Sequence, residues 1–124
     1  MIVGIGHDIE EISRFAALLA RWGDRITRKL FTDGERAYAS GKARAASHLA
    51  VRFAAKEATL KALAVPAGLR WHEMEVVGGG SEPPALVLRG RALEVAQARG
   101  IARFHLSLTH TDTVAAAVVI AEAS

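Results

Sequence analysis

The sequence predicts an α+β fold, a single domain in which an antiparallel sheet packs against one long helix. The 124 residues fit one domain and are too few for two separate cores. Short β-branched or alternating apolar runs occur near both ends of the chain. Between them, the stretch 45–64 contains no Gly or Pro and repeats apolar residues at helical spacing. We therefore expect residues 1–124 to share one core.

The chain begins with a predicted strand and helix. Ile2 to Gly6 is an apolar run ended by glycine, so we expect a buried strand that stops just before Asp8. A helix is expected from about Ser13, which is a suitable N-cap residue, and it carries Arg14 and Arg21 off its apolar face. The apolar residues at helical spacing are Phe15, Leu18, Leu19 and Trp22.

The middle of the chain is predicted to be helical. Thr32 to Gly34 is typical of a turn or a helix cap, and a short helix is expected from Glu35 to about Gly41. The long helix follows at 45–64 and ends before Pro66 and Gly68. Its apolar stripe consists of Leu49, Phe53, Leu60 and Leu63.

The rest of the chain alternates short strands with one helix. We expect strands at 71–77 and 85–88, a helix at 90–99, and a final hairpin of strands 104–108 and 114–120 that turns at 111–113. The N-terminal strand and these hairpins would form the antiparallel sheet, with the long helix on one side.

The charge of the chain is unevenly distributed. The net charge is +3, yet residues 21–61 hold ten Lys and Arg against four Asp and Glu. This excess indicates an anionic partner, which can be a nucleic acid, a phosphate-rich cofactor or an acidic protein; a solvated basic face is the alternative. Interleaved aromatic residues and known nucleic-acid-binding motifs are missing, so no nucleic acid is expected.

The composition restricts the metal and the compartment. The chain has no cysteine, so a metal would be held by Asp, Glu, His or carbonyl oxygen, which favours a hard cation. No apolar run approaches the roughly 20 residues that span a bilayer, and no signal peptide is recognisable. We therefore expect a cytoplasmic protein with no membrane partner.

The charges of the long helix do not lie on one solvent face. Arg52, Lys56, Glu57 and Lys61 spread over about half of its circumference. Lys56 falls near the middle of the apolar stripe, and a charge placed there needs a partner or an ion. In the alternative interpretation the lysine stems extend to water, and Glu57 and Lys61 form a surface ion pair.

Two carboxylates suggest a metal site. Asp8 and Glu57 are a possible Mg²⁺ pair, because Mg²⁺ commonly takes one or two carboxylates and leaves its other positions to water and phosphate. Lys61 would then neutralise a phosphate oxygen or accept a proton from an attacking hydroxyl. Arg44, Arg52 and His110 are candidate clamps for further phosphate, although a lone histidine after a strand is often structural.

Three segments resemble the acyl-carrier-protein synthases in order and spacing. They are residues 4–9 (GIGHDI) followed by Arg14 and Phe15, residues 52–58 (RFAAKEA) followed by Lys61 and Ala62, and residues 107–111 (SLTHT). The middle motif is highly specific and the other two are weak alone. The resemblance covers essentially the whole chain.

The resemblance implies the 4′-phosphopantetheinyl transferase fold, assembled as a homotrimer that binds coenzyme A in clefts between subunits. Its reaction moves 4′-phosphopantetheine from coenzyme A to a serine of apo acyl carrier protein and releases adenosine 3′,5′-bisphosphate. The alternatives are a module that binds coenzyme A or carrier protein without turnover and an Mg²⁺-dependent coenzyme A hydrolase. The carrier can belong to fatty-acid or polyketide synthesis.

The resemblance also implies roles for individual residues. Asp8 and Glu57 match the Mg²⁺ ligands, and Lys61 matches a lysine near the pyrophosphate, so these three are the expected catalytic residues. The expected coenzyme A contacts are Arg44, Arg52, Lys61, Pro84 and His110, partly through the 3′-phosphate. The expected carrier-protein contacts are Arg14 and Arg21.

Two loops depart from the family pattern. Residues 64–68 (AVPAG) replace a glycine-rich turn, so we expect a differently shaped loop beside the pantetheine. Before Pro84 the chain has Gly-Gly-Gly-Ser-Glu-Pro in place of a Gly-Lys-Pro type of approach. A positive contact to the nucleotide is therefore expected to be missing.

Overall fold

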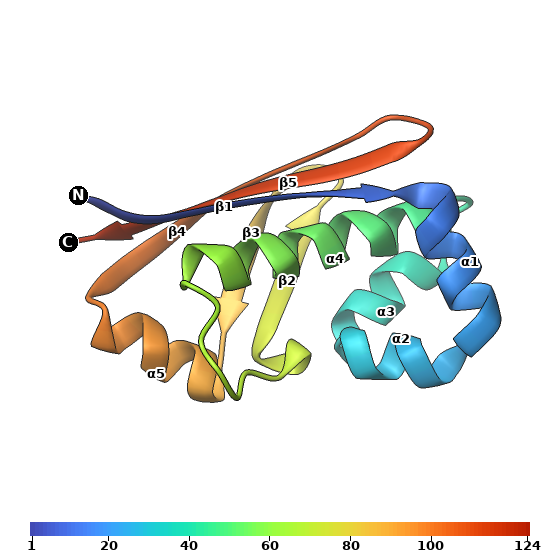
Figure 1. Ribbon diagram of the computed structural model, residues 1–124. Coiled ribbons are helices and arrows are strands. Elements are labelled where there is room, and N and C mark those ends of the chain that lie inside the picture. The colour runs from blue at the N-terminus through green and yellow to red at the C-terminus, as the bar shows by residue number, and fades with distance from the viewer.

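Three strands form an antiparallel sheet in the order β1 (Ile2–Glu11), β5 (Val114–Ala123) and β4 (Ile101–His110). The computed structural model describes all of residues 1–124. The helix α4 (Ala45–Ala62) runs along one face of this sheet (Figure 1). The two chain ends lie side by side, since the backbone N–H of Ala123 donates to the carbonyl of Met1 at 2.8 Å.

The remaining elements surround α4. The helices α1 (Ile12–Trp22), α2 (Asp24–Leu30) and α3 (Asp33–Ser40) gather at one end of it, and α5 (Gly90–Ala98) lies toward the other (Figure 1). A short 3₁₀ turn (Trp71–Glu73) leads into a second sheet of β2 (Met74–Gly79) and β3 (Glu82–Leu88). None of the helices combines the length and the apolar character that a membrane crossing requires.

The predicted fold class is confirmed, but the single predicted sheet is wrong. The strands divide into a three-stranded and a two-stranded sheet. β3 lies beside β4 without a hydrogen-bonded ladder between them. Because strand pairing depends on contacts between distant segments, the local pattern could predict the strands but not their division.

The predicted end of the first strand is also wrong. β1 continues through Asp8 to Glu11, and the register with β5 pairs Asp8 with Ala117 and Glu11 with Val114. The helix α1 then begins at Ile12, and Ser13 is not its N-cap. The backbone N–H of Ile12 instead donates to the carbonyl of Thr113 at 2.9 Å, which ties the first turn to the β4–β5 hairpin.

The helices α3, α4 and α5 were predicted from the sequence, whereas α2 was not. α2 has only seven residues, too few to establish a helical period. At the start of α3 the predicted cap is confirmed as a capping box: Thr32 Oγ1 accepts from the N–H of Glu35 at 3.2 Å, and Glu35 Oε1 accepts from the N–H of Thr32 at 2.9 Å.

β1 and α4 meet without side chains between them. A Cβ added to Gly6 would lie 1.8 Å from the carbonyl oxygen of Ala58, and one added to Gly4 would lie 2.2 Å from that of Ala62. Ala58 and Ala62 are themselves buried. Only glycine on the strand and alanine on the helix permit this approach, so these residues fix the distance between the two backbones.

Lys56 is held by a buried ion pair, so the interpretation that its stem extends to water is wrong. Lys56 and Glu35 are both fully buried, and Lys56 Nζ lies 2.5 Å from Glu35 Oε1. The ammonium group also donates to the carbonyls of Leu30 at 2.7 Å and Trp71 at 3.2 Å. Burial lowers the pKa of Lys56, and the Glu35 carboxylate opposes that change.

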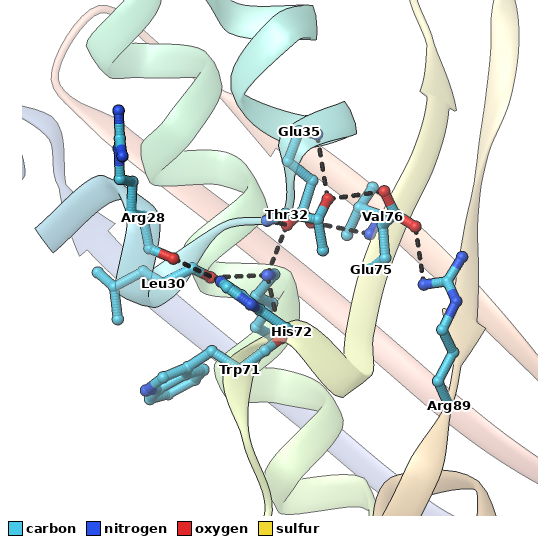
Figure 2. A network of polar contacts seen from close by, with 10 residues as sticks. Arg28, Leu30, Thr32, Glu35, Trp71, His72, Glu75, Val76 and Arg89 are labelled. Carbon is cyan, nitrogen blue, oxygen red and sulfur yellow. Dashed lines mark hydrogen bonds and ion pairs between the residues drawn. The ribbon is translucent and has the colours of Figure 1, made fainter. Parts of the chain in front are cut away.

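Glu35 extends this network to β2. Its second oxygen accepts from the backbone N–H of Val76 at 2.9 Å, beside a contact between Thr32 and Glu75 (Figure 2). The pair therefore connects α3, α4 and β2, and through the carbonyl of Leu30 it also holds the end of α2.

The close approach of β1 to α4 predicts a large effect of Gly6→Ala. The added methyl group must separate the strand from the helix, so the free energy of unfolding should fall by about 3 kcal/mol or more. Urea denaturation followed by circular dichroism measures the change. Gly41→Ala is the control: its added Cβ meets nothing within 4 Å and its φ is −92°, so its effect should stay within about 0.5 kcal/mol. Equally small effects would contradict the close approach.

Candidate active site

Asp8 faces α4 from the middle of β1. Successive side chains of a strand alternate between its faces, so Asp8 shares the face of Gly4 and Gly6 that lies against α4. Its side chain is 14% exposed, and Oδ1 lies 3.4 Å from Lys61 Nζ. Its other oxygen, Oδ2, is buried and has no hydrogen-bond partner. One carboxylate oxygen is therefore available to a further cationic partner.

Lys61 joins α4 to β1 at this point. Its Nζ donates to the carbonyl of His7 at 2.9 Å and to Asp8. The alternative surface ion pair between Glu57 and Lys61 is not formed, because Lys61 turns toward the strand. The predicted grouping of Asp8 and Lys61 is therefore present, with Lys61 half exposed above the strand.

Glu57 lies one helical turn before Lys61 and is close enough to Asp8 and Lys61 for their charges to affect its pKa. Burial and the charge of Asp8 raise the pKa of the Glu57 carboxyl, while Lys61 partly opposes the rise. Glu57 is partly buried on the α1 side of α4, where it lines a hollow. Asp8 and Glu57 thus repel each other across the junction of β1 and α4.

Glu10 is a third carboxylate, which the sequence reasoning missed. Burial and the negative charges of Asp8 and Glu57 raise the pKa of Glu10 to about 8, while Arg14 opposes the rise. A strand that continued past Gly6 would have placed residues 8 and 10 on one face. The two-residue spacing of Asp8 and Glu10 could therefore have identified Glu10 as a neighbour of Asp8. It was missed because the strand was predicted to end before Asp8.

This group of carboxylates fits a hard divalent cation. The oxygen Oδ2 of Asp8 has no partner, and burial and the charge of Asp8 raise the pKa of Glu57, so a cation between Asp8 and Glu57 would satisfy both. The protein does not gather three or more His, Asp or Glu side chains into a complete cage. Mg²⁺ suits such a site, because it keeps water or phosphate on its other positions.

The first hollow lies between the end of β1, α1 and α4. Its volume is about 740 Å³, and Glu10 and Glu57 contribute to its wall. Arg14 and Arg21 from α1 also line it and are exposed, with the guanidinium of Arg21 5.1 Å from the ring centre of Trp22. The basic face of α1 therefore borders the same hollow as the carboxylates of Glu10 and Glu57.

A second hollow lies on another side of α4. It has a volume of about 320 Å³ and lies among α3, α4, the turn between β2 and β3, and the end of β4. Arg52, Pro84 and His110, three of the predicted contact residues, line it. Arg52 is only 3% exposed; it lies 4.0 Å from the ring centre of Tyr38 and donates to the carbonyl of Gly78 at 2.8 Å. Burial lowers its pKa.

Arg44 lies outside both hollows. It precedes α4 and its side chain is exposed, with Nη1 2.8 Å from Oδ1 of Asp112 in the β4–β5 turn. This contact raises the pKa of Arg44 and lowers the pKa of Asp112. Arg44 is therefore near the second hollow along the helix but already has an anionic partner.

The predicted site residues form two groups within one chain. Asp8, Glu57 and Lys61 come together at β1, and Arg52, Pro84 and His110 come together at the second hollow. The two hollows have no lining residue in common. Arg52 and Glu57 point roughly 140° apart around α4 at 100° per residue, so the two groups lie on different sides of this helix.

The chain is similar to known proteins over almost its whole length. Residues 4–119 match the family model of the 4′-phosphopantetheinyl transferase superfamily. A holo-[acyl-carrier-protein] synthase of Salinispora arenicola is 45% identical over 98% of this chain and 99% of that protein. The solved synthase of Neisseria meningitidis has a TM-score of 0.85 and 31% identity, covering 98% of this chain and 99% of that one.

A further solved structure contains a ligand. It is a holo-(acyl-carrier-protein) synthase of Bacillus anthracis in complex with CoA (3′,5′-ADP), with a TM-score of 0.80 and 32% identity. The similarity covers 100% of this chain and 99% of that one.

Proposed function

This chain belongs to the 4′-phosphopantetheinyl transferase superfamily, and we propose that it acts there as a holo-[acyl-carrier-protein] synthase. It transfers 4′-phosphopantetheine from coenzyme A to a serine of apo acyl carrier protein, and adenosine 3′,5′-bisphosphate is the second product. The resemblance found in the sequence is confirmed by the family match and by the relatives. The grouping of Asp8, Glu57 and Lys61 beside a hollow with a basic rim is the observation that carries the proposal.

Asp8 and Glu57 would hold Mg²⁺ in this enzyme. The unpartnered Oδ2 of Asp8 and the raised pKa of Glu57 support this assignment, because the first is an acceptor without a donor and the second is a carboxyl whose ionisation is opposed by burial and by the charge of Asp8. When bound, Mg²⁺ would supply charge neutralisation for the pyrophosphate of coenzyme A. Residues 1–124 would form the single transferase domain.

Lys61 would act as a charge clamp. Its Nζ donates to the carbonyl of His7 at 2.9 Å and to the carboxylate of Asp8 at 3.4 Å. An ammonium group can neutralise a phosphate oxygen but cannot accept a proton, so we assign the proton of the serine hydroxyl to water. The serine oxygen forms a bond to the β-phosphorus, and the bond from that phosphorus to the oxygen of the nucleotide phosphate breaks.

The protein contributes position and charge to this transfer rather than a covalent intermediate. Arg14 and Arg21 would bind an acidic helix of the carrier protein at the rim of the first hollow. Arg44, Arg52, Pro84 and His110 would hold the nucleotide end of coenzyme A. The cytoplasmic location and the role of the carrier in fatty-acid synthesis stay predictions.

A homotrimer with active sites between subunits would unite the two groups of residues. The separation of the first group from Arg52 and His110 within one chain supports this arrangement. The face of the three-stranded sheet opposite α4 carries exposed apolar residues: Ile5 and Ile9 are each 65% exposed, and Val118 is 40% exposed. Such a face favours association with another protein surface.

Magnesium should stabilise the isolated protein through Glu57. A ligand at about 100 times its dissociation constant adds about 2.7 kcal/mol to the stability, so Mg²⁺ should raise Tm by several degrees in differential scanning fluorimetry. Glu57→Gln should lose this gain. Glu94→Gln, which removes an exposed carboxylate from α5, should keep it. The assignment is wrong if Glu57→Gln and the unmodified protein gain equally.

The trimer should be visible by light scattering coupled to size exclusion. The expected mass is three times the chain mass of 13.2 kDa. Ile9→Glu should reduce the mass to that of one chain, because a charge on the open sheet face cannot be desolvated without cost. Leu93→Glu is the control, since Leu93 is likewise an exposed apolar residue but lies on α5.

Mixing experiments extend this test. Glu57→Gln and His110→Ala chains, each impaired alone, should regain activity when mixed if one active site takes its residues from two subunits. A single-chain mass for the unmodified protein, or no recovery on mixing, would contradict the shared site.

The transfer itself should be visible by intact-mass spectrometry of an apo acyl carrier protein. Incubation with this protein, coenzyme A and Mg²⁺ should add one phosphopantetheine to the carrier, and EDTA or Glu57→Gln should abolish the addition. Free phosphopantetheine with an unmodified carrier would indicate a hydrolase. Binding of coenzyme A with no change in several carriers would indicate a module without turnover.

A further inference from the structure

A third hollow lies along α2. It has a volume of about 240 Å³ and is lined by Trp22, Arg25, Ile26 and Lys29. Lys29 comes three positions after Ile26 and four after Arg25, so these side chains share one face of α2. Arg25 and Lys29 are exposed, and Trp22 is 47% exposed. This face of α2 therefore presents two cations to solvent beside an indole ring.

A fourth hollow continues from the third. It has a volume of about 410 Å³ and is lined by Lys29, Leu69, Arg70, Trp71 and His72. Lys29 lines both hollows, so they adjoin along α2. The third hollow adjoins the first in the same way, through Trp22. We call the third and fourth hollows together the basic groove.

The core holds the walls of the basic groove in place. The carbonyl of Trp71 accepts a hydrogen bond from the buried ammonium group of Lys56 at 3.2 Å, and the ring centres of Trp71 and Phe53 are 5.3 Å apart. Nε2 of His72 contacts the carbonyl of Arg28, which joins the 3₁₀ turn to α2 (Figure 2). The groove is therefore preformed, and a partner does not have to order it.

The lining of the basic groove carries charge of one sign. None of its residues is acidic. Arg25, Lys29 and Arg70 are all exposed, and none of them takes part in an ion pair within the chain. Three cations without an ion-pair partner favour an anionic ligand.

Two carboxylates neighbour these cations in the sequence but line neither hollow. They are Asp24, before Arg25, and Glu73. The carboxylate of Glu73 accepts from the backbone N–H groups of Arg70 and Arg91, each at 2.8 Å. These hydrogen bonds lower the pKa of Glu73, and the charge of Arg70 contributes less. Glu73 is therefore mainly a partner of the backbone, and the groove keeps an excess of positive charge.

The apolar part of the groove distinguishes between anionic partners. Ile26 lies on one wall and Leu69 on the other, so a segment with both acidic and apolar side chains would satisfy both kinds of contact. A single-stranded nucleic acid would instead need free aromatic faces for stacking. The ring of Trp71 already packs against Phe53. The groove therefore fits an acidic protein segment.

The groove lies beside the proposed carrier-protein contacts. α2 and the 3₁₀ turn lie on the side of α4 away from the three-stranded sheet (Figure 1), so an assembly through the open face of that sheet would leave the groove free. Through Trp22 the groove continues the surface that carries Arg14 and Arg21. A carrier protein bound to α1 would thus lie next to α2.

We propose that the basic groove binds a second acidic segment of the carrier protein, outside the helix that Arg14 and Arg21 would hold. The inference rests on the proposed function for the identity of the partner. Lys29 and Arg70, one on each wall, would contact carboxylates of this segment. The enzyme would then select its carrier by two acidic segments and not by one helix alone.

Isothermal titration calorimetry of the full-length protein with apo acyl carrier protein tests the proposal. Lys29→Glu and Arg70→Glu should each raise the dissociation constant about five-fold or more, because an attractive charge pair becomes a repulsive one. In about 1 M salt, where the Debye length is about 3 Å, most of this difference should vanish.

Arg91→Glu is the charge-matched control. Arg91 is exposed on α5, lines neither hollow of the groove, and its Nε donates to the carbonyl of Ala67 at 3.1 Å. It should change the dissociation constant much less than Arg70→Glu does. Equal effects of Arg70→Glu and Arg91→Glu would mean that only the net charge matters, and the proposal would be overturned.

A photoreactive residue identifies the segment that occupies the groove. Leu69→p-benzoylphenylalanine, illuminated with apo acyl carrier protein, should form an adduct whose mass-spectrometric fragments contain an acidic carrier segment. Leu18→p-benzoylphenylalanine, in the first hollow, should capture the recognition helix instead. Capture of one and the same segment at both positions, or no capture from position 69, would contradict the second contact.

Nucleic acid is the other anionic class that the experiments distinguish. A labelled single-stranded oligonucleotide should not bind to the groove. If it binds, if Arg70→Glu abolishes this binding and if the carrier affinity is unchanged, the groove is a nucleic-acid site and the proposal is wrong.

The proposal and the proposed function fail differently. If the carrier stays unmodified in the mass-spectrometric experiment while its binding depends on Lys29 and Arg70, the transferase function fails and the docking groove stands. If the carrier is modified but neither variant weakens its binding, the function stands and the docking groove fails.

Discussion

β1 and α4 meet through their backbones, with Gly4 and Gly6 against the carbonyl oxygens of Ala62 and Ala58. Because no side chain separates them, Lys61 can reach across from the helix to the carbonyl of His7 and to Asp8. A wider spacing, such as the roughly 10 Å between layers that pack through side chains, would take Lys61 away from the strand. The relative positions of Asp8 and Lys61 therefore depend on glycine and alanine residues that take no part in the reaction.

The ion pair of Glu35 and Lys56 holds the other side of α4. It joins α3 and β2 to the helix, and both elements contribute walls to the second hollow. Breaking a buried pair by removing one partner leaves an uncompensated charge and costs about 3–5 kcal/mol. The two hollows are thus supported by different contacts of one helix: close backbone packing on one side and a satisfied ion pair on the other.

Sequence reasoning succeeded where the signal was local. The long helix, the Thr32 cap and the final hairpin each follow from neighbouring residues. The grouping of Asp8 with Lys61 was expected from the chemistry of the two carboxylates and from the family resemblance. The predictions failed where contacts between distant segments determine the structure. Pairing with β5 carries β1 past Gly6, and Glu35, the partner of Lys56, comes from another helix, so neither could be found from the local pattern.

Lys56 and Lys61 are five positions apart on one helix but differ in their reactivity toward acylating reagents. Lys61 is 47% exposed and meets reagents from solvent, whereas Lys56 is fully buried with its ammonium group bound to three oxygen atoms. An acyl donor can reach Lys56 only in molecules whose α3 and β2 have separated from α4. The rate at which Lys56 is acylated would therefore follow the opening of the core and not the nucleophilicity of the amine.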